Sequence, residues 1–201
     1  EQHAGQLGHI VSWRVPASIA IDELRAALKA AGLPDSLAAD MAIRHAMSRA
    51  LRNMNKNRVI RKLRRDGDEL VFQINREHAG ADHIEFPHEA DVRCDLNTGT
   101  VSSDDAGIEA RAQLLLQEHL GKRLTNDLTR LVQRVFDDRR ADLIPIREQG
   151  GAYFVPDMHR DLVDKVRQLL QAIGGNLRSF AVRLGSADTA ASVADSMTDY
   201  L

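Results

Sequence analysis

The chain of 201 residues carries 27 Lys or Arg, 29 Asp or Glu, 43% hydrophobic residues and a single cysteine. This is the composition of a globular protein that is large enough to bury a core, and one cysteine excludes an intramolecular disulfide and a multi-thiolate zinc site. No apolar run approaches the ~20 residues of a membrane span, and the first residues lack the apolar core of a signal peptide. We therefore expect a cytoplasmic protein that contacts no membrane.

The first elements are a strand and two helices. Residues 9–15 are rich in β-branched and aromatic side chains and end at Pro16, which predicts a strand. A helix follows, with apolar side chains three and four residues apart, and Gly32 is the expected left-handed stop. The apolar stripe of the second helix includes Met47 and Leu51.

Residues 44–65, here named the basic block, include the polar faces of the second helix. The basic block holds nine Lys or Arg and no acidic residue, whereas the rest of the chain has 18 basic against 29 acidic residues. Such an asymmetry indicates an anionic partner.

Residues 58–65 and 69–76 are expected to form a hairpin across Asp66-Gly67, because Asp-Gly favours a tight turn. The first of these strands carries charges on both faces, which suits an edge strand. A further strand, bent at Pro87, and a short strand at Val101 complete a mixed or antiparallel sheet with helices on one face. We expect an α+β unit over residues 1–103.

The polar run 102–105 predicts a boundary, and residues 104–201 are expected to form a second unit. Its predicted order is helix, helix, hairpin (142–147 with 152–156), helix (158–173), strand (177–184) and an Ala-rich helix (188–201). Helix–helix–hairpin is the order of a winged helix. The chain continues, however, so the hairpin can instead belong to a small ββαβ sheet.

We expect the basic block to contact phosphates of a nucleic acid. The candidate residues are Arg44, Arg49, Arg52, Lys56, Arg58, Arg61, Lys62, Arg64 and Arg65. Two structural interpretations stay open: a solvated edge that needs no ligand, or charge neutralised by acidic residues of the chain or of a partner protein.

The winged-helix interpretation adds Arg130 and Arg134 as a second nucleic-acid contact. Asp127 and Asp137 lie among these basic residues and would repel phosphates.

A cluster of histidines and carboxylates suggests a metal centre of a hydrolase, formed by His78, Asp82, His83, Glu85, His88, Glu89 and Asp91. His83 and His88 are five residues apart, so they would lie on opposite faces of a regular strand, and a surface loop explains the cluster better. We therefore expect no metal. Gly150-Gly151 and Gly174-Gly175 match no nucleotide-binding motif, so we also expect no cofactor. Cys94 alternates with Val92 and Leu96, which predicts a buried side chain rather than a nucleophile.

The run from Gly150 to Pro156, the early strand with Trp13 and the basic second helix resemble a domain-of-unknown-function family of phages, plasmids and prokaryotic genomes. The resemblance implies a mobile-element or host-defence setting and supplies no catalytic residues. Three hypotheses follow: a non-enzymatic nucleic-acid-binding module, an adaptor that oligomerises or docks on an acidic protein partner, or a metal-dependent hydrolase.

Overall fold

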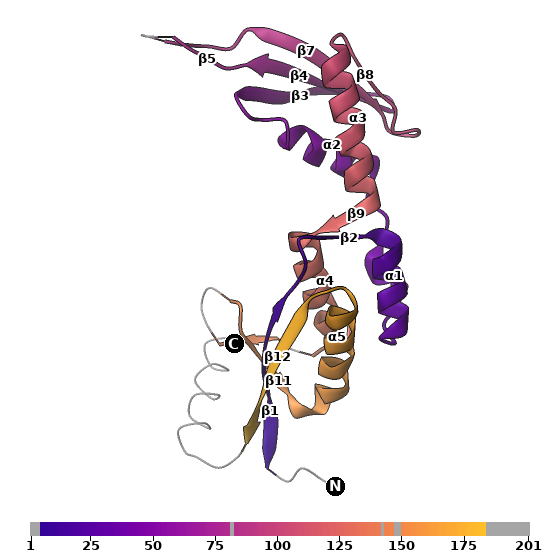
Figure 1. Cartoon of the computed structure of the whole chain (residues 1–201), viewed down its shortest axis with the longest axis vertical. Helices are drawn as coiled ribbons and strands as arrows, with labels where there is room; N and C mark the ends of the chain where they lie inside the picture. The colour runs from indigo at the N-terminus through magenta and orange to yellow at the C-terminus, as the bar shows by residue number, and fades with distance from the viewer. Residues whose placement is uncertain (1–4, 81–82, 142, 147–149, 184–201) are drawn as a thin grey trace. The chain divides into compact units, whose positions relative to one another are not determined.

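The computed structural model describes residues 5–80, 83–141, 143–146 and 150–183. These residues form an α+β structure, as predicted, with antiparallel strand pairing in its sheets (Figure 1). The chain divides into two compact units: unit 1 takes residues 1–39 and 123–201, and unit 2 takes residues 40–122. This division differs from the predicted one near residue 104, because the segments on both sides of that position belong to unit 2.

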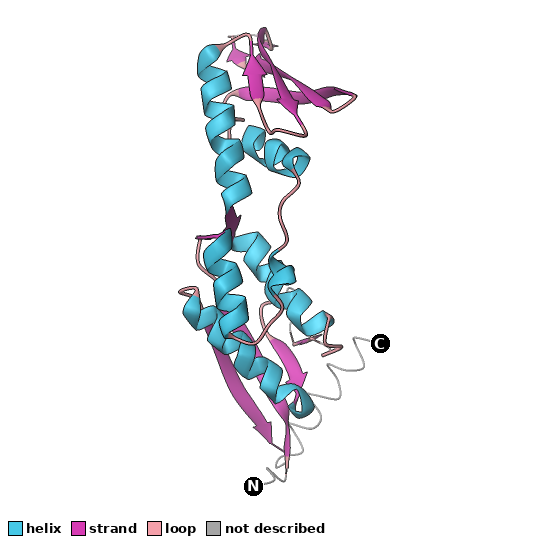
Figure 2. Cartoon of the chain, turned by 90° about the vertical axis from the view of Figure 1, so that its right-hand side faces the viewer, coloured by secondary structure: helices cyan, strands magenta, loops and turns pink. Residues whose placement is uncertain are grey.

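Unit 2 contains a four-stranded sheet of order β3-β4-β7-β8, two helices and a two-stranded extension. Its elements are α2 (Ile43–Arg52), β3 (Arg58–Asp66), β4 (Glu69–Arg76), β5 (His78–Ala79), β6 (Ile84–Glu85), β7 (His88–Asp95), β8 (Val101–Ser103) and α3 (Ala106–Gly121). Figure 2 shows the sheet on one side of α2 and α3. The hairpin at Asp66-Gly67 is confirmed, since Gly67 has φ of 57° and Asp66 pairs with Glu69.

Alternation along the central strands builds the core of unit 2. Leu70, Phe72 and Ile74 point from β4 toward the helices and are each at most 4% exposed. They pack with the apolar stripe of α2, where Met47 and Leu51 are buried. The sheet and both helices therefore share one core within residues 40–122.

Unit 1 is assembled from both ends of the described chain. β1 lies between β11 and β12 in the order β10-β11-β1-β12, and β2 pairs with β9 in a separate ribbon. Its elements are β1 (Gln6–Arg14), β2 (Ser18–Ala20), α1 (Ile21–Ala30), a 3-10 turn (Asp35–Ala38), β9 (Lys122–Leu124), α4 (Thr125–Asp137), β10 (Ile144–Pro145), β11 (Tyr153–Pro156), a second 3-10 turn (Asp157–His159), α5 (Arg160–Ala172) and β12 (Asn176–Arg183).

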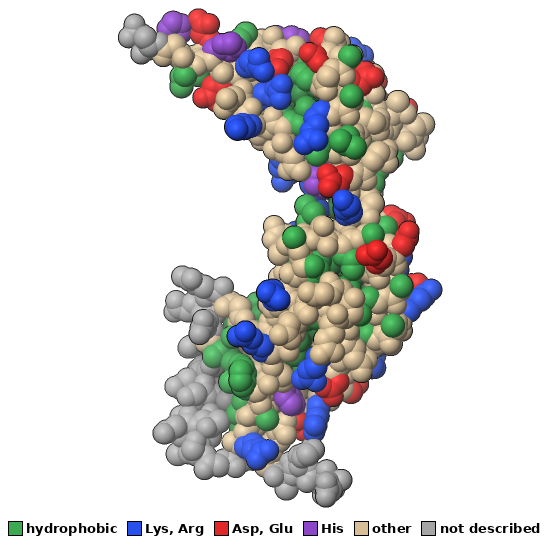
Figure 3. Space-filling model, in the orientation of Figure 1, with side chains coloured by type: hydrophobic (Ala, Val, Ile, Leu, Met, Phe, Trp, Pro, Cys, Tyr) green, Lys and Arg blue, Asp and Glu red, His purple; other side chains and the backbone are tan. Residues whose placement is uncertain are grey.

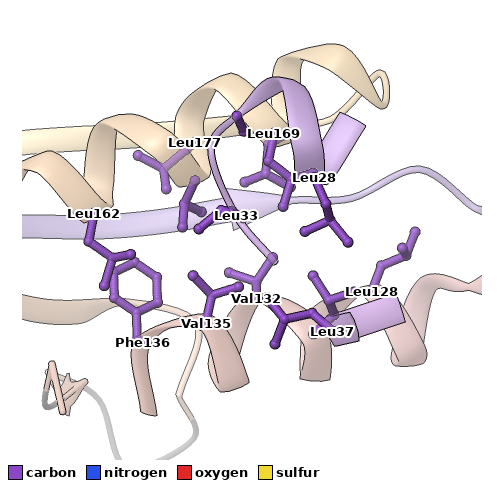
Figure 4. Close-up of a cluster of buried hydrophobic side chains, with 14 of the residues drawn as sticks. Leu28, Leu33, Leu37, Leu128, Val132, Val135, Phe136, Leu162, Leu169 and Leu177 are labelled. Atoms are coloured by element: carbon purple, nitrogen blue, oxygen red, sulfur yellow. The ribbon is translucent and has the colours of Figure 1, made fainter. Parts of the chain in front are cut away.

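One face of this sheet is covered by α1, α4 and α5, whose apolar stripes meet in the larger core of the chain (Figure 4). Phe136, Leu28 and Leu169 are completely buried there. Trp13 stacks on Tyr153 with ring centroids 5.0 Å apart. The only tryptophan of the chain is thus a probe of unit 1.

The winged-helix topology is not confirmed. α3 belongs to unit 2 and packs on α2, whereas α4 belongs to unit 1. The hairpin of β10 and β11 joins β1 in the sheet of unit 1. The predicted helix at 188–201 lies outside the described residues.

None of the helices in the described part of the chain has the length and hydrophobicity that crossing a membrane requires.

Gly8 is required by the close approach of β11 to β1. A Cβ at this position would lie 2.3 Å from the carbonyl oxygen of Val155 and 2.7 Å from the ring of Phe154. We expect Gly8→Ala to lower the free energy of unfolding of unit 1 by about 1–3 kcal/mol, because the strands must separate to admit the methyl group. Urea unfolding followed by Trp13 fluorescence measures the loss. An unchanged transition midpoint would contradict this packing.

Cys94 is completely buried on β7, as predicted. Burial, together with the negative charges of Asp95 and Glu69, raises the pKa of the thiol to about 11. The thiol of the native protein therefore stays protonated at neutral pH. We expect slow alkylation by iodoacetamide in the native state and rapid alkylation in guanidinium chloride. Rapid native labelling would show that the strand is not closed over the thiol.

Candidate nucleic-acid interface

All nine Lys and Arg of the basic block lie in unit 2, on one continuous segment that runs from α2 through a loop into β3 (Figure 1). On α2, the stripe that includes Met47 and Leu51 faces the core, so Arg44 and Arg52 are exposed on the other side. Arg49 is half-buried and has a contact of its own within the chain. Lys56 is exposed in the loop.

β3 is an edge strand, as predicted, because its only sheet neighbour among the described strands is β4. Lys62 pairs with Phe72 and so lies on the helix side of the sheet, whereas Arg61 pairs with Gln73 on the opposite side. The register shifts between Lys62 and Arg64. The charges of β3 therefore reach both faces of the sheet edge.

Arg58 differs from the rest of the basic block because it is held in an ion pair inside the unit. Its Nε and Nη2 donate to the two carboxylate oxygens of Glu89, each over 2.7 Å. The side chains of Arg58 and Glu89 are only 23% and 16% exposed, and Arg76 approaches the same carboxylate at 3.6 Å. These hydrogen bonds raise the pKa of Arg58 and lower the pKa of Glu89, although burial opposes both shifts. Arg58 thus ties β3 to β7 and is not available to a phosphate.

At the tip of the hairpin, Arg64 and Arg65 have only weak acidic partners, although Arg65 also donates from Nε to the carbonyl oxygen of Gly67 over 2.9 Å. Arg64 lies 3.8 Å from Asp66, and Arg65 lies 3.9 Å from Asp68, with all four side chains more than half exposed. Exposed pairs at such distances contribute little to stability and exchange readily for other partners. Both guanidinium groups remain accessible to an anion.

Five basic side chains of the block are exposed and have no acidic side chain within 4.0 Å among the described residues. We name them the cationic surface: Arg44, Arg52, Lys56, Arg61 and Lys62. Arg44 donates from Nε to the ring of His45 over 3.2 Å, which leaves its charge unpaired. Figure 3 shows several basic side chains on the visible face of unit 2, with acidic side chains and histidines among them. Because Arg61 and Lys62 lie on opposite faces at the edge of the sheet, a polyanion would have to follow that edge to contact both.

Arg130 and Arg134 lie on α4, in unit 1, so they do not belong to the same unit as the basic block. Arg130 is exposed. Arg134 donates from Nη2 to the carbonyl oxygen of Leu37 over 3.3 Å, which partly occupies it inside the unit.

The histidines and carboxylates that were considered as a metal centre form separate pairs where the structure describes them. His83 lies 2.8 Å from Glu85, His88 lies 3.0 Å from Asp91, and Glu89 is held by Arg58. Asp82 lies outside the described residues. The described part of the chain contains no group of three or more side chains that could hold a metal ion.

A buried polar network in unit 1 was not predicted. His9, which is 8% exposed, has its Nδ1 3.1 Å from the Ser179 hydroxyl and its Nε2 3.4 Å from Asp157. Gln6 also approaches Nε2, at 2.9 Å. Because the imidazole is enclosed and shared among three partners, we assign this network to the stability of the sheet rather than to catalysis.

A cavity of about 310 Å³ on the sheet of unit 1 was also not predicted. Ser12, Trp13 and Arg14 from β1 and Asn176 and Arg178 from β12 line it. These residues come from opposite ends of the chain, so only the pairing of β1 with β12 reveals that they are neighbours.

The pair of Arg58 and Glu89 yields a prediction on stability. We expect Glu89→Gln to lower the free energy of unfolding of unit 2 by about 1–3 kcal/mol at pH 7, because a charged hydrogen-bonded pair is lost. The lowered pKa of Glu89 means that the contribution is complete above its ordinary value of 4.5 and is lost as the pH falls through the lower, folded value. Hydrogen exchange of the amides of β4 and β7 measures the change. Equal exchange in variant and wild type at pH 7 would exclude a stabilising role.

Comparison with known proteins gives one family. The model of a family of unknown function, DUF6744, matches residues 6–199. No curated protein and no solved structure gives a significant match. The match spans both units, from the first described strand through the last, so both units belong to the region that defines the family. The chain belongs to the DUF6744 family, whose function is unknown.

Proposed function

We propose that the chain is a non-enzymatic nucleic-acid-binding module whose main phosphate contact is the cationic surface of unit 2. The observation that carries the proposal is the set of five exposed basic side chains without an acidic partner on one continuous segment. Several other basic side chains of the described chain do have acidic partners, as in the pair of Lys29 with Asp35 at 3.2 Å. An anion that joins the cationic surface would not first have to displace a carboxylate.

The chemistry favours contacts with the phosphate backbone over contacts with bases. Proteins that read single strands stack bases on aromatic side chains, and this chain has one Trp, two Tyr and five Phe. Trp13 and Tyr153 stack on each other in unit 1. We therefore propose binding that depends on salt and weakly on sequence, to DNA or RNA.

Arg64 and Arg65 extend the same surface along the hairpin, because their exposed pairs with Asp66 and Asp68 can open at little cost. Arg49 flanks the surface on α2. Arg130 and Arg134 are proposed as a second, weaker contact from unit 1. A cytoplasmic location and a mobile-element or host-defence setting complete the proposal.

The edge strand β3 supports a second candidate function. It pairs with β4 along one side only, so its outer backbone groups can accept a strand from an acidic protein or from a second copy of the chain. In that case the basic block would select the partner by charge. Light scattering and pull-down experiments test this adaptor function, and a strictly monomeric chain that captures no partner would exclude it.

Binding across a salt series tests the nucleic-acid proposal. We expect labelled duplex DNA, single-stranded DNA or RNA to bind at about 20 mM salt, with log K falling linearly against log salt concentration. In the double variant Arg61→Glu and Lys62→Glu, the slope should decrease in magnitude by about two, one for each phosphate contact removed. Fluorescence anisotropy measures both quantities.

The matched control changes the same charge in unit 1, by Arg139→Glu and Arg160→Glu, which are both exposed. The control should keep most of the salt slope. Absence of binding to all three nucleic acids at low salt, or an equal loss in both double variants, would contradict the proposal.

A further inference from the structure

The cavity of unit 1 brings two arginines together on one face of the sheet. β1 and β12 are antiparallel, with Ser12 opposite Arg178 and Arg14 opposite Asn176. Because side chains alternate along a strand, all four lie on the same face, and Arg14 and Arg178 are diagonal neighbours. This is the face opposite Val11, which packs against the helices.

Neither arginine is neutralised by the described part of the chain. Arg14 and Arg178 are both exposed, and no acidic side chain of the described residues lies within 4.0 Å of either. Like charges on neighbouring strands repel each other, so the arrangement costs stability when no anion is near. Two arginines that line one cavity without a carboxylate partner indicate a site for an external anion.

The lining of the cavity specifies the kind of anion. Each guanidinium presents a planar fork of N–H donors that matches the oxygens of a phosphate, and the Ser12 hydroxyl and the Asn176 amide add neutral donors. A cavity of about 310 Å³ is at the lower end of small-molecule sites and is larger than a single phosphate requires. A phosphate carrying a further group therefore fits it.

We propose that the Arg14–Arg178 cavity of unit 1 is a binding site for the phosphate group of a phosphorylated ligand. The ligand is a diphosphate or nucleotide, or a phosphate of a polynucleotide. The site is separate from the cationic surface, which belongs to unit 2, and stands on its own observations.

Inorganic pyrophosphate is the probe. Isothermal titration of the full chain at low ionic strength should show saturable binding with one site at the cavity. Arg14→Ala and Arg178→Ala should each weaken binding by about tenfold or more, as expected for the loss of a charge-assisted hydrogen bond. Arg183→Ala removes the same charge from an exposed position on the same strand and should leave binding unchanged.

Competition separates the two sources of phosphate. The competition uses the variant Arg61→Glu, Lys62→Glu, in which two positive charges of the cationic surface are replaced by negative ones. If an oligonucleotide displaces pyrophosphate from this variant, the ligand of the cavity is a polynucleotide. Failure to displace it identifies a small phosphorylated ligand. Absence of saturable pyrophosphate binding to the wild-type chain, or an equal loss in Arg183→Ala and Arg178→Ala, overturns the proposal whether or not unit 2 binds nucleic acid.

Discussion

Antiparallel pairing between β1 and β12 is the constraint on which the arrangement of the chain depends. It runs from Gln6 opposite Arg183 to Arg14 opposite Asn176 and places the first and last described strands side by side. Residues 40–122 are consequently inserted between the two segments of unit 1, and they form a sheet, two helices and a core of their own. An insertion of this kind is tolerated because the entropy of closing a loop grows slowly with its length. The basic block is therefore displayed by a complete unit.

Packing divides the basic block into two roles. Arg58 reaches a carboxylate at the bulged end of β7, where both groups are largely removed from water and a bidentate pair forms. Arg61 and Lys62 lie farther along the edge strand, opposite Gln73 and Phe72 of β4, and neither has an acidic side chain within 4.0 Å among the described residues. Basic residues occur throughout this stretch of the sequence. Their exposure to water and their acidic partners, however, differ from residue to residue. Only the exposed, unpaired part is suited to bind a polyanion.

Local patterns predicted the parts of the fold that local physics decides. The α+β class, the turn at Asp66-Gly67, the edge position of β3 and the burial of Cys94 follow from alternation, turn chemistry and charge. The boundaries of the units and the partner of the β11 hairpin depend on which distant strand pairs with which, and periodicity carries no information on that. The same reason explains why the pair of Arg58 with Glu89 and the Arg14–Arg178 cavity were not anticipated, since each joins separate strands.

The central claim is that the unpaired cations of the basic block, and not its net charge, contact nucleic acid. Amide and side-chain NMR shifts of the full chain, recorded as a short duplex is added at low salt, test it most directly. The account predicts that the largest shifts fall on Arg52, Lys56, Arg61 and Lys62, while the guanidinium signal of Arg58 stays in its position. Shifts centred on Arg58 and Glu89, or confined to unit 1, would contradict the account.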